Sequence, residues 1–489
     1  MDKVPPEVVF LGVLIVVGAV LRFATLASQS YWTDEATTVH DIHGSLGALL
    51  HQVRVNETTP PLYFLVAWGW AKLFGTGEVA LRSLSALAGI AVIPITYLCG
   101  RELVSRWAGL VAAAFAAVSP FMIWYSQEAR SYALLAALSG ASFLFCARAW
   151  RTAARRDLVW WAVFSALAIL THFYAGYLVA PEAVLLLYRV RRRATVVAVG
   201  AVAVVQLAML PLAISDTTHP LGWITTFSLW TRVQQISIDL GLRTLYESSL
   251  VTHGVLIAAL LAAACTALIV LAGGRDERRG AAFAGGLAAF VVLAPIVLAL
   301  LGRDYVVPRN LTPAWIPLAV VLGAACTVPR ARLLGAGLAA ALIAVFIWGG
   351  VRIAQNPEYQ RADWRGVARA LGSAGGPRAI VAYDGGFAAQ PLWVFMRGTA
   401  WQQPLSDVAT VGEVDVVGNS WQAPASRLPA GTRLISARTV DGFLVARFAV
   451  APAWQRSLAA IGASAGSLLA PAPVPAHPAV LLQRASASS

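Results

Sequence analysis

Long apolar runs alternate with short polar connections along most of the sequence. A helix that crosses a bilayer needs about 20 mainly apolar residues, and runs near this length predict eleven spans. They lie at residues 8–27, 81–99, 107–123, 131–147, 158–171, 174–188, 194–214, 250–272, 281–301, 311–328 and 333–351. Because only helices and closed barrels satisfy the backbone inside lipid, the pattern predicts a mainly α, polytopic membrane protein.

The first long loop, residues 28–80, contains an apolar stretch that is too short to cross a membrane. Residues 61–74 combine this short length with Trp68, Trp70 and Lys72. Tryptophan and lysine are typical of the membrane–water interface. We therefore expect interfacial helices in this loop.

The apolar runs shorten after residue 351, which predicts a separate domain. Strands are expected near residues 379–383, 414–417, 433–436 and 443–450, with a helix near 387–396. The predicted organisation is a membrane domain at 1–351, a small α/β domain at 352–455 and a Pro/Ala-rich tail at 456–489. The composition of this tail is typical of disorder.

The distribution of charge predicts an orientation. Only 12% of the residues are charged, against roughly 25% in soluble domains. Every second connection is short and arginine-rich: Arg101/Arg106, Arg148–Arg156, Arg189–Arg193, Arg275–Arg279 and Arg330/Arg332. The positive-inside rule places these turns in the cytoplasm and the first loop and the C-terminal domain outside. Orientation explains the net charge of +13, so no nucleic-acid partner is expected.

The expected outer face carries a few ionisable residues in short motifs. Asp34 and Glu35 follow the first span; further along the chain come Arg82, Glu128, Arg130, His172 and Arg309. Ionisable groups near bilayer depth cost about 2.5–3.5 kcal/mol each. Singly, each has a structural explanation, such as a snorkelling arginine or a histidine that caps a helix. Together on one face, they indicate a functional site.

Glycosyl transfer from a lipid-phosphate sugar fits these residue types. Asp34 would take the proton from an acceptor hydroxyl as a general base. Arg82, Arg130 and Arg309 would neutralise the departing phosphate, and Tyr63 and Tyr125 are expected to help bind substrate or phosphate. Apolar walls between the spans would hold a polyprenyl chain. The sequence shows no Gly-rich nucleotide-sugar fingerprint, which favours a donor delivered within the bilayer.

Several motifs resemble those of a known family. They are Tyr-Trp-Thr-Asp-Glu at 31–35, Thr-Pro-Pro-Leu-Tyr-Phe at 59–64, Arg-Ser-Leu-Ser-Ala-Leu at 82–87, SPFMIWYSQEARSYAL from residue 119 and Thr-His-Phe-Tyr at 171–174. In this order they resemble the bacterial GT-C glycosyltransferases of glycosyltransferase family 39. This group is related to the dolichyl-phosphate-mannose protein mannosyltransferases and to the lipid A aminoarabinose transferase. The resemblance covers about residues 8–350.

The resemblance implies an inverting enzyme of the bacterial cytoplasmic membrane, with its active site and C-terminal domain outside. It implies that Asp34 is the catalytic base, that Glu35 is its structural or binding neighbour, and that Glu128 is the second acidic position. Many relatives have a histidine where this chain has Thr59. Some relatives hold a metal between a first-loop acid and a span-end histidine, which implies a possible divalent metal at Glu57 and His172. The implied partners are a polyprenyl-phosphate sugar and a glycan, lipid or protein acceptor.

Two other classes of protein share parts of this pattern. A transporter or lipid flippase would also be polytopic and carry buried charges, but here the charges lie near one face and no repeated halves are apparent. A non-catalytic scaffold would use the C-terminal domain for binding and would leave the first-loop acidic pair unexplained. The transferase is therefore the preferred interpretation.

Overall fold

The chain folds into two compact units. The computed structural model describes residues 5–55, 57, 59–212, 224–243, 248–383, 389–396, 398–399, 404–472 and 478–484. The first unit is Met1–Leu26 with Ser45–Tyr359, and the second is Ala27–Gly44 with Gln360–Ser489. The boundary near 359 lies close to the predicted one at 351. Residues 27–44, which the prediction assigned to the membrane domain, belong instead to the second unit.

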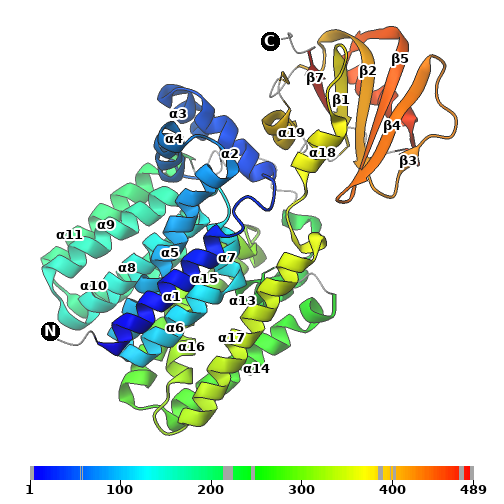
Figure 1. Cartoon of the computed structure of the whole chain (residues 1–489). Helices are drawn as coiled ribbons and strands as arrows, with labels where there is room; N and C mark the ends of the chain where they lie inside the picture. The colour runs from blue at the N-terminus through cyan, green and yellow to red at the C-terminus, as the bar shows by residue number, and fades with distance from the viewer. Residues whose placement is uncertain are drawn as a thin grey trace. The chain divides into compact units, whose positions relative to one another are not determined.

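The first unit is helical (Figure 1). Its elements are α1 (Pro6–Phe23), α3 (Leu46–Val55), α4 (Leu62–Phe74), α5 (Glu78–Leu103), α6 (Arg106–Val118), α7 (Pro120–Ser126), α8 (Tyr132–Thr152), α9 (Arg155–Thr171), η1 (Phe173–Ala175), α10 (Gly176–Val190), α11 (Arg193–Ala208), η2 (Ile224–Thr226), α13 (Leu229–Leu242), α14 (Ser248–Ala272), α15 (Arg275–Leu300), η3 (Pro308–Ala314), α16 (Trp315–Cys326), α17 (Arg332–Gln355) and η4 (Pro357–Tyr359).

The number of spans is smaller than predicted. Among the described residues, eight helices are long and apolar enough to cross a membrane, or nine if α6 and α7 form one bent span. Two of the eleven predicted spans do not reach this length, because α9 has 17 residues and α16 has 12. The 3-10 helix η3 contains the first residues of the predicted span 311–328, and α16 contains most of the rest. The polytopic helical class is confirmed.

Two short helices of the first loop belong to this unit. α4 is apolar and has 13 residues, so it is too short to span, as predicted. It packs against α3, α5 and α9. Lys72 lies 5.4 Å from the ring centroid of Trp68 on the same helix.

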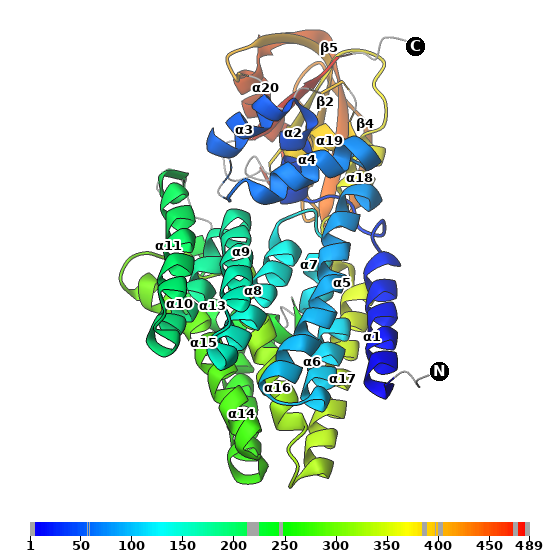
Figure 2. The ribbon, with the colours of Figure 1, turned by 90° about the vertical axis from the view of Figure 1, so that its left-hand side faces the viewer.

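The core of the first unit lies where α5, α6, α8 and α16 meet. α5 packs against α6 and α8, and α16 packs against α5, α6 and α8. Small residues allow close contact: Gly109 N lies 2.9 Å from where a Cβ of Gly100 would stand. On the other side, α8 contacts α9 and α10, and α10 contacts α11 and α15 (Figure 2).

The second unit is a mixed sheet with helices. Strands β1 (Arg378–Ala382), β2 (Val408–Asn419), β4 (Thr432–Val440), β5 (Phe443–Ser457) and β7 (Ala479–Gln483) form one sheet in the order β4-β5-β2-β1-β7; β3 (Ala423–Pro424) pairs with β6 (Leu469–Ala470). The β1–β2 pair is parallel and the other pairs are antiparallel. The four predicted strands are therefore present. The helical elements are α2 (Thr33–His43), α18 (Trp364–Leu371), α19 (Ala389–Phe395), α20 (Leu458–Ala465) and η5 (Gly466–Leu468).

The segment 456–489 differs from its predicted disorder. α20 and β7 both lie in it, and Leu458, Ile461 and Leu468 are buried in the same core as β2 and β5. The apolar residues between the prolines and alanines supply this packing. Residues 473–477 and 485–489 lie outside the described part of the chain.

Candidate active site

Glu57 and Arg130 form a buried ion pair in the first unit. Arg130 donates from Nη1 to Oε1 at 3.3 Å and from Nη2 to Oε2 at 3.4 Å. Thr59 Oγ1 donates to Oε2 at 3.4 Å, and the Arg130 guanidinium lies 5.6 Å from the Phe64 ring centroid. The pair therefore ties the first loop to the turn between α7 and α8.

Tyr132, His172 and Arg309 lie beside this pair. Tyr132 begins α8, and its ring centroid is 5.7 Å from that of His172, which follows α9. The Arg309 guanidinium lies 5.9 Å from the Tyr132 centroid. Both Arg309 and Arg130 affect the ionisation of His172 electrostatically. The structure thus brings together three motifs that are far apart in the sequence.

The environment of His172 keeps its imidazole neutral. Burial, followed by the positive charges of Arg130 and Arg309, lowers the pKa of His172 from its ordinary 6.5 to about 3. Its Nδ1 accepts the Tyr174 backbone N–H at 3.3 Å. A neutral imidazole with Nδ1 as acceptor carries its proton on Nε2, so His172 is a hydrogen-bond donor through that atom.

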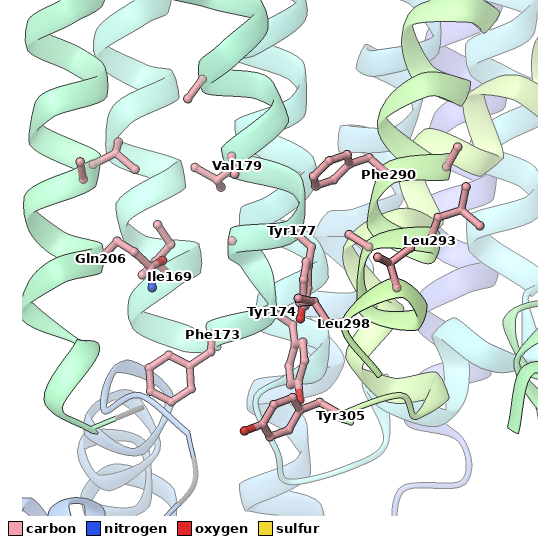
Figure 3. Close-up of a pocket in the computed structure, with 18 of the residues that line it drawn as sticks. Ile169, Phe173, Tyr174, Tyr177, Val179, Gln206, Phe290, Leu293, Leu298 and Tyr305 are labelled. Carbon is pink, nitrogen blue, oxygen red and sulfur yellow. The ribbon is translucent and has the colours of Figure 1, made fainter. Parts of the chain in front are cut away.

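A row of aromatic rings connects these residues to a large apolar cavity. The ring centroid of Tyr174 lies 5.0 Å from that of His172, with the planes tilted, and 5.6 Å from that of Tyr177, with the rings stacked. It also lies 6.5 Å from that of Tyr305. All three tyrosines line a cavity of about 1090 Å³ between α10, α11 and α15 (Figure 3). Most other lining residues are aliphatic or phenylalanine; Gln206 of α11 is an exception. The cavity therefore suits a lipid chain, and one end adjoins the cationic residues.

Arg243 is a further cation at this site that sequence reasoning missed. It follows α13 and has φ +47, a region that non-glycine residues rarely adopt. Its guanidinium lies 4.5 Å from the Trp124 ring centroid and 5.5 Å from that of Tyr125. Nη1 is 3.8 Å from Asp239 Oδ2. An arginine at the end of an amphipathic loop helix was the only available signal.

Tyr125 joins Arg243 to the rest of the cluster. Its ring lies 5.1 Å from that of Tyr132 and 4.8 Å from that of Phe121. Tyr63 is also buried, with its ring 5.8 Å from that of Phe64. Tyr125 therefore lies among the arginines. Tyr63 contacts the ring of Phe64, which in turn contacts Arg130.

Glu128 is buried in the turn that presents Arg130. Its carbonyl oxygen accepts the Arg130 backbone N–H at 2.8 Å, and Ser85 Oγ of α5 donates to the Arg130 carbonyl at 3.3 Å. These hydrogen bonds fix the backbone conformation at Arg130.

Arg82 is fully buried on α5, and its Nη1 donates to the Leu26 carbonyl at 2.8 Å. The predicted phosphate ligand thus anchors the chain just after α1. Another missed pair is Arg232 and Asp304, whose side chains form two hydrogen bonds at 2.7 and 2.5 Å. The bonds from Arg232 hold the pKa of Asp304 below its ordinary value.

Asp34 and Glu35 begin α2 in the second unit, where the helix N-terminus favours negative charge. Glu35 is fully buried, with Oε2 3.7 Å from Arg361 Nε. Arg361 also donates its backbone N–H to Gln29 Oε1 at 2.9 Å. Asp34 is half-buried, and its backbone carbonyl accepts a hydrogen bond from Thr38. The two adjacent carboxylates therefore have different surroundings.

The residues do not fit a divalent metal at Glu57 and His172. Both carboxylate oxygens of Glu57 accept hydrogen bonds from Arg130, and the charges of Arg130 and Arg309 reach His172. Within the described part of the chain, no group of three or more His, Cys, Asp and Glu residues could hold a metal ion.

Comparisons with known proteins give a family match for part of the chain and a fold for nearly all of it. Residues 58–218 match the family described as dolichyl-phosphate-mannose-protein mannosyltransferase. No curated protein matches the chain at a significant level. The apo structure of ArnT from Cupriavidus metallidurans aligns with a TM-score of 0.51 and 14% identity, over 90% of this chain and 97% of that one.

Two further structures align with lower scores. ArnT from Cupriavidus metallidurans bound to undecaprenyl phosphate gives a TM-score of 0.47 and 15% identity, over 90% of this chain and 97% of that one. The Archaeoglobus fulgidus oligosaccharyltransferase, solved with zinc and sulfate, gives 0.42 and 14% over 74% of this chain. The chain spans 55% of the length of that oligosaccharyltransferase.

The family match includes much of the candidate site. Residues 58–218 contain Tyr63, Arg82, Glu128, Arg130 and His172. The alignment to apo ArnT extends over nearly all of both chains, including the sheet-containing region, and establishes the GT-C fold. Residues 58–218 of the chain thus match the dolichyl-phosphate-mannose-protein mannosyltransferase family, and the chain is a polytopic membrane protein with the GT-C fold of ArnT.

Proposed function

We propose that the chain transfers a sugar from a polyprenyl-phosphate-linked donor to an acceptor hydroxyl at the outer face of the bacterial cytoplasmic membrane. The observation that carries this proposal is the position of Tyr174. It lines the apolar cavity, and its ring contacts His172 with the centroids 5.0 Å apart. A polyprenyl chain in the cavity would place its phosphate beside the arginines. The family name, which specifies a dolichyl-phosphate sugar, supports the same donor class.

The phosphate would be bound by several donors. Arg309 and Arg243 lie over the rings of Tyr132 and Tyr125, and guanidinium groups suit phosphate because their N–H groups form a planar fork. His172 would donate from Nε2. Arg130 contributes positive charge while its pair with Glu57 fixes its position. Arg82 and Glu128 support this group from α5 and from the turn before α8.

The chemical step would be a single displacement. Asp34 takes the proton of the acceptor hydroxyl while that oxygen forms a bond to the anomeric carbon. The bond between that carbon and the phosphate oxygen breaks, and its electron pair stays on the phosphate. The lipid phosphate leaves as an anion that the arginines stabilise. Attack opposite the leaving group inverts the anomeric configuration.

The acceptor would be a hydroxyl of a glycan, lipid or protein. Glu35 would position Asp34 by holding the start of α2 against Arg361. This division of work gives each member of the acidic pair its own role.

Donor binding tests the proposal. The purified protein in nanodiscs would be titrated with undecaprenyl phosphate, and transfer would be followed from labelled undecaprenyl-phosphate hexoses and pentoses to an envelope extract. Arg309→Gln should weaken undecaprenyl phosphate binding about tenfold to a hundredfold, since it removes a charge-assisted phosphate contact. Arg303→Gln is the matched control, because Arg303 is an exposed arginine of the same loop.

Two results would contradict the proposal. Transfer that requires a soluble nucleotide sugar, with every lipid-linked sugar inert, would exclude the donor class. Equal weakening by Arg303→Gln and Arg309→Gln would exclude a specific phosphate site at Arg309.

A further inference from the structure

A second cavity opens at the other end of the α10–α15 contact. It has a volume of about 880 Å³ and is lined by α8, α10 and α15. It shares Ala180, Gly286 and Phe290 with the first cavity. This volume lies within the range of ordinary ligand pockets, roughly 300–1,000 Å³. Arginines line its far end, whereas tyrosines line the far end of the first cavity.

Arg189 and Arg279 both line this second cavity. Arg189 lies in the last turn of α10, and Arg279 in the second turn of α15. Both are exposed, and within the described residues neither forms a hydrogen bond or an ion pair. Two cations beside one cavity with no carboxylate between them repel each other. A bound anion would remove this repulsion.

The rest of the lining favours a lipid over a free anion. Trp150 of α8 lines the same end, and its ring lies 5.5 Å from that of Phe283, another lining residue. Tryptophan is typical of the depth at which lipid head groups begin. Val184, Leu185 and Leu287 continue the wall between the helices. An acyl chain fits this apolar wall, and a phosphodiester fits the arginines.

We propose that this cavity is a binding site for an anionic phospholipid, with the phosphate at Arg189 and Arg279 and an acyl chain between α10 and α15. Basic pockets between membrane helices commonly bind such head groups. The site is separate from the donor phosphate site at Arg309 and does not depend on sugar transfer. Its occupant has two acyl chains and a phosphodiester, unlike a polyprenyl phosphate.

Native mass spectrometry of the delipidated protein tests this proposal, with palmitoyl-oleoyl phosphatidylglycerol and the matching phosphatidylcholine as probes. The wild type should hold one phosphatidylglycerol at least tenfold more tightly than phosphatidylcholine. The double variant Arg189→Gln/Arg279→Gln should lose this preference. Arg193→Gln/Arg278→Gln is the matched control, because these arginines are in the same two connections, carry the same charge and do not line the cavity.

A third variant separates the apolar part of the site from its charge. Ala282 is exposed and lines only the second cavity, so Ala282→Trp should block it and release the lipid while both arginines remain. Equal losses in the control and test doubles would show general attraction to a basic surface and overturn the proposal. Displacement of phosphatidylglycerol by undecaprenol, a neutral polyprenyl alcohol, would also overturn it. That result would assign the cavity to the end of a polyprenyl chain.

Discussion

Individual arginines of the first unit differ in what their guanidinium groups contact. Arg22 bonds backbone carbonyls, Arg130 bonds a carboxylate, and Arg243 and Arg309 lie over aromatic rings. A guanidinium over a ring keeps its charge and presents its N–H groups at its edge. We therefore expect Arg243 and Arg309 to contact the donor phosphate directly, and Arg22 to act in folding.

Substitutions of the adjacent acids Asp34 and Glu35 should affect different properties: turnover at Asp34 and stability at Glu35. Asp34→Asn should lower turnover by about 10²–10⁴-fold, since it removes a general base, and should cost only about 0.3–1 kcal/mol of stability, through the lost charge at the N-terminus of α2. Glu35→Gln leaves the buried Arg361 without its anionic partner and should cost about 3–5 kcal/mol. Turnover and thermal unfolding of both variants check this. Near-normal turnover of Asp34→Asn, with loss of turnover in Glu128→Gln, would move the base to Glu128.

His172 should make stability depend on pH on the acid side. Its pKa is lowered to about 3 in the folded chain, so between that value and the ordinary 6.5 the unfolded state binds the extra proton. Stability should therefore fall as the pH drops below 6.5, by about 1.4 kcal/mol per pH unit from this group. Replacing His172 by Gln should reduce the fall in melting temperature between pH 7 and pH 5. An unchanged fall would show that His172 is accessible to protons in the folded chain.

At the scale of elements, apolar run length predicted most helices and failed where helices break. The run at 107–123 reads as one span, but the chain bends by 57° between α6 and α7. Proline has no N–H, so Pro120 cannot bond the Ala116 carbonyl. Instead, Arg22 Nη2 donates a hydrogen bond to this carbonyl at 2.8 Å, and Arg22 Nη1 donates one to the Ala117 carbonyl at 3.1 Å. Sequence marks the break at Pro120, but not the distant arginine that satisfies it.

The bend should depend on Arg22. In Arg22→Leu, the carbonyls of Ala116 and Ala117 lose their bonds from Arg22 in a buried site, which should cost about 2–4 kcal/mol. Because α7 carries Tyr125, undecaprenyl phosphate binding should weaken as well. Arg106→Gln is the control, since Arg106 is an exposed arginine whose pair with Glu7, at 3.6 Å and partly exposed, contributes about 0–1 kcal/mol. Unfolding in detergent and lipid titration measure both effects. Equal stability of the two variants would refute the role assigned to Arg22.

Contacts between distant segments account for most of what sequence could not predict. Motif spacing identified Arg130, His172 and Arg309 as members of one site, and the structure brings them together. Arg243 was missed because it belongs to none of the motifs that indicated the site, and a position at the end of an amphipathic helix does not by itself identify a functional arginine. The resemblance implied a possible metal at Glu57, whereas the structure pairs Glu57 with Arg130, 73 positions away. A local pattern records which residues are unusual, but not which of them neutralise each other.

At the scale of the whole molecule, the chain passes between the two units more than once. Residues 27–44 leave the first unit and join the second, and the chain returns at Ser45. Ser30 Oγ donates to the Ala362 carbonyl at 2.8 Å, and Arg365 donates to the Ala27 carbonyl at 3.1 Å. The first-loop acids therefore fold with the C-terminal sheet. Hydrophobic patterning does not predict this, because such pairs join residues more than 330 positions apart.

The orientation of the molecule is the last prediction. The arginine-rich turns should face the cytoplasm, because positive charge is retained on that side during insertion. Single cysteines would be introduced at Ser45, Ser420 and Arg156, which are all exposed. The native Cys99, Cys146, Cys265 and Cys326 are buried, and serine would replace them to remove background labelling. A membrane-impermeant maleimide should label positions 45 and 420 in intact cells, and position 156 only after permeabilisation. Arg193, replaced by Cys in the next arginine-rich turn, should behave like position 156. External labelling at 156 and 193 would reverse the topology and place the candidate site in the cytoplasm, where lipid-linked donors would have to be presented on the inner leaflet.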